Sequence, residues 1–70
     1  MTTFNFSANG IDFGYYEGAT QALAQESFAT DAGYQSWAAM VEQAEEVGGG
    51  NSVEVREVLE NGRLSLVEAV

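Results

Sequence analysis

Apolar and polar residues alternate on both sides of Asn9-Gly10. This dipeptide between alternating segments is typical of a two-residue hairpin turn, because both turn positions take positive φ. The turn predicts one antiparallel register, which places all the apolar residues of both strands on one face. The predicted pairs on that face are Ala8 with Ile11, Phe6 with Phe13 and Phe4 with Tyr15. The opposite face receives Thr3, Asn5, Ser7, Asp12, Gly14 and Tyr16.

A first helix is predicted over residues 21–29, where helix propensity is high. Thr20 is the expected N-cap, because its hydroxyl can accept a free backbone N–H of the first turn. Gly33 is expected to end the helix in the left-handed conformation, with Tyr34 folding back onto it. The residues that share the apolar face of this helix are Leu23, Ala24 and Phe28.

A second helix is expected after Ser36, whose side chain is the predicted cap. Apolar residues then recur with the spacing i, i+3, i+4, which is typical of an amphipathic helix. They are Trp37, Met40, Val41, Ala44 and Val47, while Glu42, Glu45 and Glu46 fall on the solvent side. The run Gly48-Gly49-Gly50 is expected to end the helix and form a link.

The segment 53–58 alternates like a half-buried strand, and Asn61-Gly62 marks a second hairpin that returns through residues 64–67. Two registers are open. A three-residue loop with Gly62 in a bulge pairs Val58 with Leu64 and Val55 with Val67, whereas a two-residue loop pairs Leu59 with Leu64. The first register is preferred.

The predicted order is therefore β-β-α-α-β-β within a single domain, residues 1–70. The expected α+β architecture is one antiparallel sheet of two hairpins, with both helices packed on one face.

The charge of the chain is unusual for its size. Eleven Asp and Glu residues face two Arg and no Lys or His, which gives a net charge of −9 on 70 residues. Such a charge repels nucleic acids and anionic membranes and attracts basic surfaces, so we expect a basic protein partner and neither direct nucleic-acid nor membrane binding. A surface that only keeps the protein in solution is the alternative interpretation of the charge.

The residue types argue against catalysis. Without His, Cys or Lys, the commonest general bases and nucleophiles are missing, so we expect no enzyme. The glycine-rich segment 48–52 lacks a Lys and follows a helix, unlike a phosphate-binding loop. The acidic residues do not have calcium-loop spacing, so no metal or cofactor is expected, although a weak cation site stays an alternative.

Neither a membrane span nor a signal peptide is evident, and we expect a cytoplasmic protein. The aromatic residues Phe28, Tyr34 and Trp37 are predicted to belong to the core rather than to a binding platform. Tyr16, in contrast, is predicted on the polar face, where an exposed tyrosine suits a protein interface.

The charge density is comparable to that of nucleic acid, which suggests mimicry of DNA by carboxylates. The opening Met1-Thr2-Thr3-Phe4, the segment Asp12-Phe13-Gly14-Tyr15-Tyr16-Glu17 followed by helices, and the acidic, Cys-free composition resemble small phage-encoded anti-CRISPR proteins that inhibit type I Cascade. The resemblance implies a phage protein acting in the bacterial cytoplasm. It also implies that the protein occupies the Lys/Arg surface, particularly on the Cascade large subunit, where the complex grips target DNA.

Two alternatives remain at this point. One is inhibition of another host DNA-binding enzyme, and the other is an acidic protein-interaction module. Such a module could be a homodimer that pairs through a sheet edge or the second hairpin. Both a monomer and a homodimer stay open. The residues predicted to bind the partner are Asp12, Tyr16, Glu17, Glu26, Asp31, Glu42, Glu45, Glu46, Glu54 and Glu57.

Overall fold

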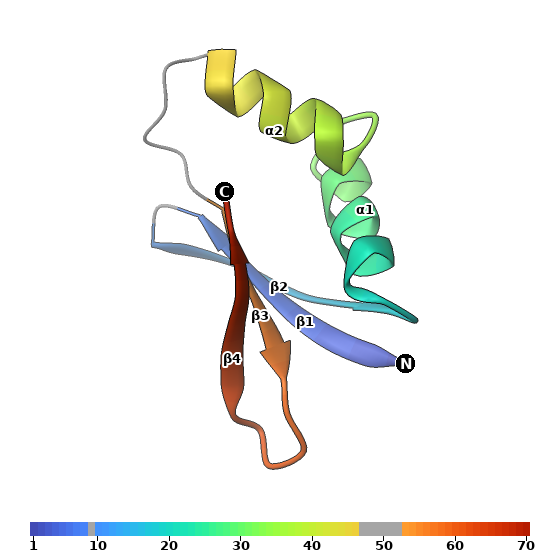
Figure 1. Ribbon diagram of the computed structural model, residues 1–70, viewed down its shortest axis with the longest axis vertical. Helices are drawn as coiled ribbons and strands as arrows, with labels where there is room; N and C mark the ends of the chain where they lie inside the picture. Colours follow the sequence, from blue (N-terminus) through green and yellow to red (C-terminus); the bar gives the residue numbers. More distant parts are fainter. Residues whose placement is uncertain (9, 47–52) are drawn as a thin grey trace.

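The computed structural model describes residues 1–8, 10–46 and 53–70, and the order of its elements is the predicted one (Figure 1). The elements are β1 (Thr2–Ala8), β2 (Ile11–Gly18), α1 (Gln21–Asp31), α2 (Trp37–Glu46), β3 (Val53–Val58) and β4 (Leu64–Ala69). The predicted glycine link at residues 48–50, and the predicted core positions Ala44 and Val47, lie outside the described residues and side chains.

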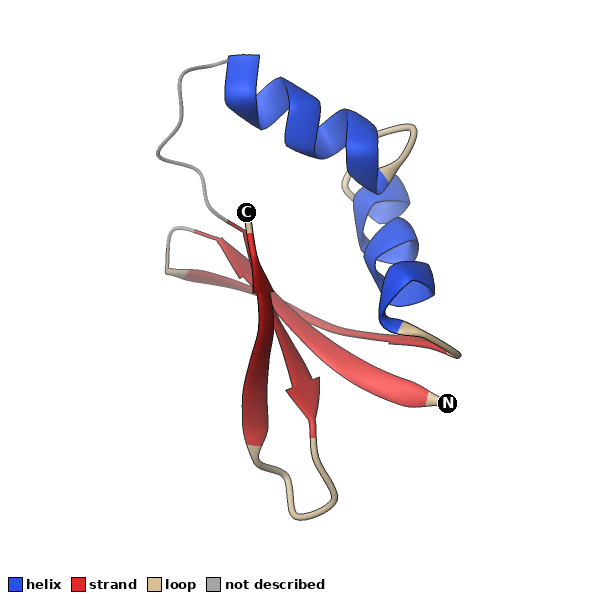
Figure 2. Cartoon of the chain, viewed as in Figure 1, coloured by secondary structure: helices blue, strands red, loops and turns tan. Residues whose placement is uncertain are grey.

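The four strands form one antiparallel sheet in the order β2-β1-β3-β4. Each hairpin therefore contributes one central and one outer strand, and the two hairpins meet through β1 and β3. Both helices lie on the same side of the sheet, and no helix of the described residues covers the other face (Figure 2). The predicted α+β architecture is confirmed.

The core lies between the sheet and the helices and is centred on Phe6, which is completely buried. Its ring stacks on that of Phe28 from α1, with the centroids 4.5 Å apart and the planes 7° from parallel. Trp37 from α2 meets Phe6 at 6.2 Å in an edge-on arrangement. Phe28 is buried, and Tyr34 and Trp37 are half-buried against the core, so the predicted core role of these aromatic residues is confirmed. The buried apolar residues are Phe4, Phe6, Ala24, Phe28, Ala29, Met40, Val53 and Val55.

The predicted helix ends are also confirmed. The Oγ1 atom of Thr20 accepts the backbone N–H of Leu23, and the Oγ atom of Ser36 accepts that of Ala39. Gly33 follows α1 with a φ of +99°, and Tyr34 donates its backbone N–H to the carbonyl of Ala29. This is the Schellman arrangement, in which glycine avoids the steric cost that a side chain meets at positive φ.

One expectation for α1 is wrong. Leu23 is 54% exposed instead of sharing a buried face with Ala24 and Phe28. The sheet covers the other flank of the helix, where Gln25 is buried. The amide of Gln25 is satisfied there, because its Nε2 donates to Oε1 of Glu68 on β4 at 3.0 Å.

The first hairpin begins as predicted but then changes register. Ala8 pairs with Ile11; Gly10 in the turn has a φ of +80°, and Asn9 lies outside the described residues. A bulge next follows, so that Phe6 pairs with Gly14 and Phe4 with Tyr16, and the predicted pairs with Phe13 and Tyr15 are wrong. Gly14 has a φ of +93°, which allows the extra residue in β2. Tyr16 consequently lies on the helix-covered face and Tyr15 on the open one.

The second hairpin repeats this behaviour. Val58 pairs with Leu64 and Gly62 has a φ of +81°, which confirms the preferred register next to the loop. Further along, an irregularity pairs Val55 with Glu68, so the predicted pairing of Val55 with Val67 is wrong. This shift turns Glu68 toward α1, where Gln21 and Gln25 both donate to its Oε1 atom.

Candidate functional site

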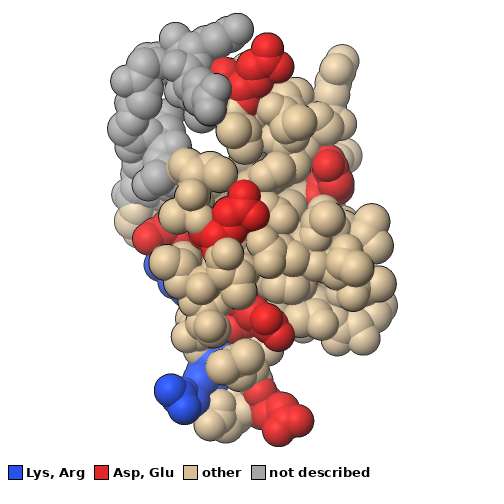
Figure 3. Space-filling model, viewed as in Figure 1, with Lys and Arg blue, Asp and Glu red and all other residues tan. Residues whose placement is uncertain are grey.

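Carboxylates are the most abundant charged groups of the protein, and they lie on every helix and strand except β1, and in the second hairpin loop. Figure 3 shows acidic side chains at intervals along the length of one face, with uncharged residues between them. The molecule measures 37 × 22 × 15 Å, so the charges are distributed along an elongated body instead of forming one compact patch. Hydrogen bonding divides the predicted partner-binding residues into two groups.

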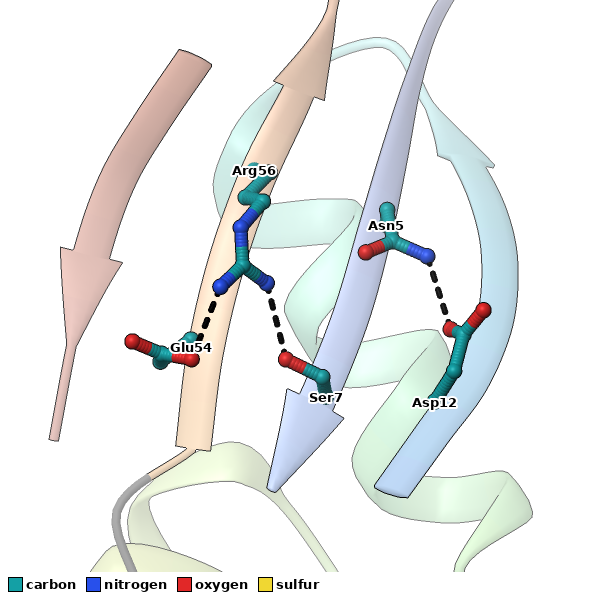
Figure 4. A network of polar contacts seen from close by, with 5 residues as sticks. All are labelled: Asn5, Ser7, Asp12, Glu54 and Arg56. Carbon is teal, nitrogen blue, oxygen red and sulfur yellow. Dashed lines mark hydrogen bonds and ion pairs between the residues drawn. The ribbon is translucent and has the colours of Figure 1, made fainter. Parts of the chain in front are cut away.

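Asp12 belongs to the group with internal partners. Its Oδ1 atom accepts the backbone N–H of Gly14 and Nδ2 of the buried Asn5, both at 2.9 Å. Asn5 also donates to the carbonyl of Gly14 at 3.1 Å, so these three residues together stabilise the bulge in β2. Figure 4 shows the contact between Asn5 and Asp12. The hydrogen bond from Gly14, followed by that from Asn5, holds the pKa of Asp12 below its ordinary value. Asp12 is exposed and therefore presents a fixed negative charge.

Glu26 on α1 connects the two helices. Its Oε1 atom accepts the backbone N–H of Trp37 at 2.9 Å, at the first residue of α2. A carboxylate at a helix N-terminus satisfies a free N–H group and interacts favourably with the helix dipole. Glu26 therefore fixes the start of α2, and it is still exposed to solvent.

Tyr16 and Asp31 were both predicted to bind the partner, and the structure joins them to each other. The Tyr16 hydroxyl donates to Oδ2 of Asp31 at 2.5 Å. This hydrogen bond is the main reason why the pKa of Tyr16 is raised above its ordinary value. The Tyr16 ring packs edge-on against Phe6 and Phe28, with each pair of centroids 5.6 Å apart. The predicted exposure of Tyr16 on the polar face is therefore wrong.

Glu54 lies beside one of the two arginines of the chain. Nη2 of Arg56 donates to its Oε1 atom at 2.8 Å, and Nη1 donates to Oγ of Ser7 at 2.8 Å (Figure 4). The side chains of Arg56 and Glu54 are 27% and 43% exposed. The charge of Glu54 is therefore largely balanced within the protein.

The second group has no such partner within the described part of the chain. It contains Glu17 at the end of β2, Glu42 on α2 and Glu57 on β3. Glu60 in the second hairpin loop also belongs here, although it was not among the predicted binding residues. The predicted residues Glu45 and Glu46 lie in the last turn of α2, with side chains outside the described part.

Sequence reasoning missed an apolar component of the surface. Tyr15 and Leu66 are 61% and 56% exposed, and both point away from the helices. The missed signal was Asp12-Phe13-Gly14, because an Asp two residues before a Gly can close a local turn and introduce a bulge. Placing that bulge would have moved Tyr15 to the open face.

Within residues 1–8, 10–46 and 53–70, no three acidic, His or Cys side chains come together to hold a metal ion. A shallow hollow on the outer side of α1 is lined by Leu23, Glu26, Ser27, Thr30 and Asp31. For the described segments, both helices are too short to cross a membrane.

Comparison of the chain with protein-family models, with curated proteins and with solved structures gives no match.

Proposed function

We propose that this protein is a non-enzymatic inhibitor that binds a basic, DNA-gripping surface of another protein and competes with the DNA. The net charge of −9 over an elongated body carries the proposal. A Lys/Arg surface that has evolved to bind phosphates pairs readily with carboxylates, because the arginine side chain donates paired N–H groups to both in a similar geometry.

The spacing of charge refines the idea of mimicry. Nine net charges along 37 Å amount to roughly one per 4 Å, against about 1.7 Å for duplex DNA and 3.4 Å for one strand. The protein therefore matches the linear charge of a single DNA strand better than that of a duplex. This favours a partner groove that contacts mainly one strand of its target.

Internal hydrogen bonds add to the proposal. Asp12, Glu26 and Asp31 each use one carboxylate oxygen internally while remaining exposed. Carboxylates that are already fixed lose less side-chain entropy on binding than free ones do. Glu17, Glu42 and Glu60 would supply additional, adaptable contacts at the periphery.

Type I Cascade is the first target to test, because the chain resembles phage inhibitors of that complex in composition and opening sequence. Purified Cascade with labelled target DNA would be titrated with the protein, and the bound fraction followed by fluorescence anisotropy. We expect DNA binding to fall at near-stoichiometric inhibitor, and the affinity of the inhibitor for Cascade, measured without DNA, to fall as the salt concentration rises. Unchanged DNA binding across several type I subtypes would contradict the Cascade assignment.

A homodimeric interaction module is the second candidate. The outer strand β4 favours it, because Leu64, Leu66 and Val67 are exposed beside an unpaired strand edge. Light scattering at low and high salt tests this directly. A dimer that forms when salt screens the charge of −9 would support it, and a monomer at both salt concentrations would contradict it.

A further inference from the structure

The face of the sheet that no helix covers has a defined arrangement of side chains. Four residues form a row across the strands, namely Tyr15, Asn5, Arg56 and Leu66, since Asn5 pairs with both Tyr15 and Arg56 and Arg56 pairs with Leu66. A second row contains Asp12, Ser7, Glu54 and Ala69. Figure 4 shows this face from the front, with the helices behind the sheet.

The row is apolar at its ends and polar in its middle. Tyr15 and Leu66 are more than half exposed, whereas Asn5 is buried and Arg56 lies along the sheet between Glu54 and Ser7. The outer residues are therefore more accessible than the central ones. Adjacent strands lie about 4.8 Å apart, so the three spacings from Tyr15 to Leu66 span roughly 14 Å.

That span has the width of a helix, which with its side chains measures about 10–12 Å. We propose that this open face is the docking surface for a basic amphipathic helix of the partner protein, which lies between Tyr15 and Leu66. The inference rests on the proposed function and assigns its binding face and the chemistry of its partner.

Charge complementarity selects this occupant. Arg56 is neutralised by Glu54, so Asp12 and Glu17 on β2 dominate the charge of the face. Lysines on one side of the incoming helix would meet these carboxylates, and its apolar side would cover Leu64 and Leu66. A second copy of this chain would instead bring two bodies of charge −9 together.

The experiment uses the full protein labelled with ¹⁵N and a synthetic 18-residue peptide that forms a Lys/Leu amphipathic helix. A scrambled peptide of the same composition is the first control. We expect amide shifts at Tyr15, Arg56 and Leu66 with the helical peptide, and weaker, diffuse shifts with the scrambled one. Shifts confined to α1 and α2, or equal binding of both peptides, would overturn the proposal.

A matched pair of leucines gives the second readout. Leu66→Gln removes an apolar contact from the open face, and Leu23→Gln does the same on α1 at nearly equal exposure, 56% against 54%. We expect L66Q to weaken peptide binding about tenfold and L23Q to leave it unchanged. Tyr15→Gln serves as a second variant from the opposite end of the row, and circular dichroism verifies the fold of each. Equal affinities of L66Q, Y15Q and L23Q would overturn the proposal.

The same variants separate this inference from the proposed function. If the wild type and L66Q displace DNA from Cascade equally well, the proposed function stands and the docking face is wrong. If the wild type displaces no DNA from any basic target but binds the peptide on the open face, the docking face stands and the proposed function is wrong.

Discussion

The hydroxyl of Tyr16 on β2 donates a hydrogen bond to the carboxylate of Asp31 in the last turn of α1, across 15 positions of the chain. It connects the outer edge of the sheet to the end of the helix that covers it. The ring of Tyr16 meanwhile packs against Phe6 and Phe28 in the core. Tyr16 therefore contributes to the stability of the fold through both its hydroxyl and its ring. Two substitutions measure the two contributions separately.

Tyr16→Phe removes only the hydroxyl and should lower the free energy of unfolding by about 0.5–1.5 kcal/mol, the usual net value of one hydrogen bond. Tyr16→Ala also removes the edge-on contacts and should cost at least about 2 kcal/mol. Urea denaturation of both variants checks this. Equal losses would contradict the division between ring and hydroxyl.

Alkaline pH should act on the same pair. The pKa of Tyr16 is raised above its ordinary 10.0, so its stabilising contribution is complete below pH 10 and is lost as pH rises through the folded-state value. Asp31→Asn weakens the hydrogen bond from the hydroxyl and removes the charge that opposes ionisation, so it should lower the Tyr16 pKa. Absorbance at the phenolate band, with Y16F subtracted, measures the shift. An identical titration in D31N would refute the role of Asp31.

The bulge in β2 predicts an acid-side effect. Asn5→Ala removes the donor to the Gly14 carbonyl and should cost about 1 kcal/mol. The same change should move the pKa of Asp12 back toward its ordinary 3.8, because one of its two hydrogen bonds is lost. Since a lowered pKa stabilises the fold above pH 3.8, wild-type stability should persist further into acid than that of N5A. NMR titration of Asp12 provides the measurement, and an unchanged pKa in N5A would contradict the network.

Gly18 at the end of β2 lies close against the first turn of α1. A Cβ atom added there would lie 2.7 Å from the backbone nitrogen of Ala24 and 3.0 Å from the carbonyl oxygen of Thr20. Gly18→Ala must therefore displace the first turn of α1, and we expect a loss of about 1–3 kcal/mol. Gly10→Ala is the comparison variant, because it places a side chain at a φ of +80° in open space. It therefore measures the cost of backbone strain without a steric clash. Wild-type stability of G18A would show that this contact is not tight.

Local signals explain what the sequence could predict. The caps at Thr20 and Ser36 and the turn glycines were correct, because each depends on groups within a few residues. The two bulges were not foreseen, and each one moved half of a strand to the other face. The bulge in β2 has a local signal in Asp12-Phe13-Gly14, but its cross-strand partner Asn5 becomes apparent only when the sheet is assembled.

The candidate site was predicted less well for a related reason. Counting carboxylates gave the total charge, but not which of them have internal partners. Glu26 is a helix cap for a helix that begins 11 positions later, and Glu68 accepts from glutamines 43 and 47 positions away. Only tertiary contacts distinguish Glu26 and Glu68, which have internal hydrogen-bond partners, from the exposed residues Glu17, Glu42 and Glu60.

That separation leads to the most direct test of the proposed function. A triple variant, Glu17→Gln, Glu42→Gln and Glu60→Gln, removes three exposed negative charges, and the corresponding Glu→Asp variant retains them. Displacement of labelled DNA from Cascade is measured for both at several salt concentrations. We expect the Gln variant to melt like the wild type, yet to displace DNA at least about tenfold less well and with weaker salt dependence. The Asp variant should behave like the wild type. Equal displacement by the Gln and Asp variants would contradict the claim that exposed negative charge carries the binding.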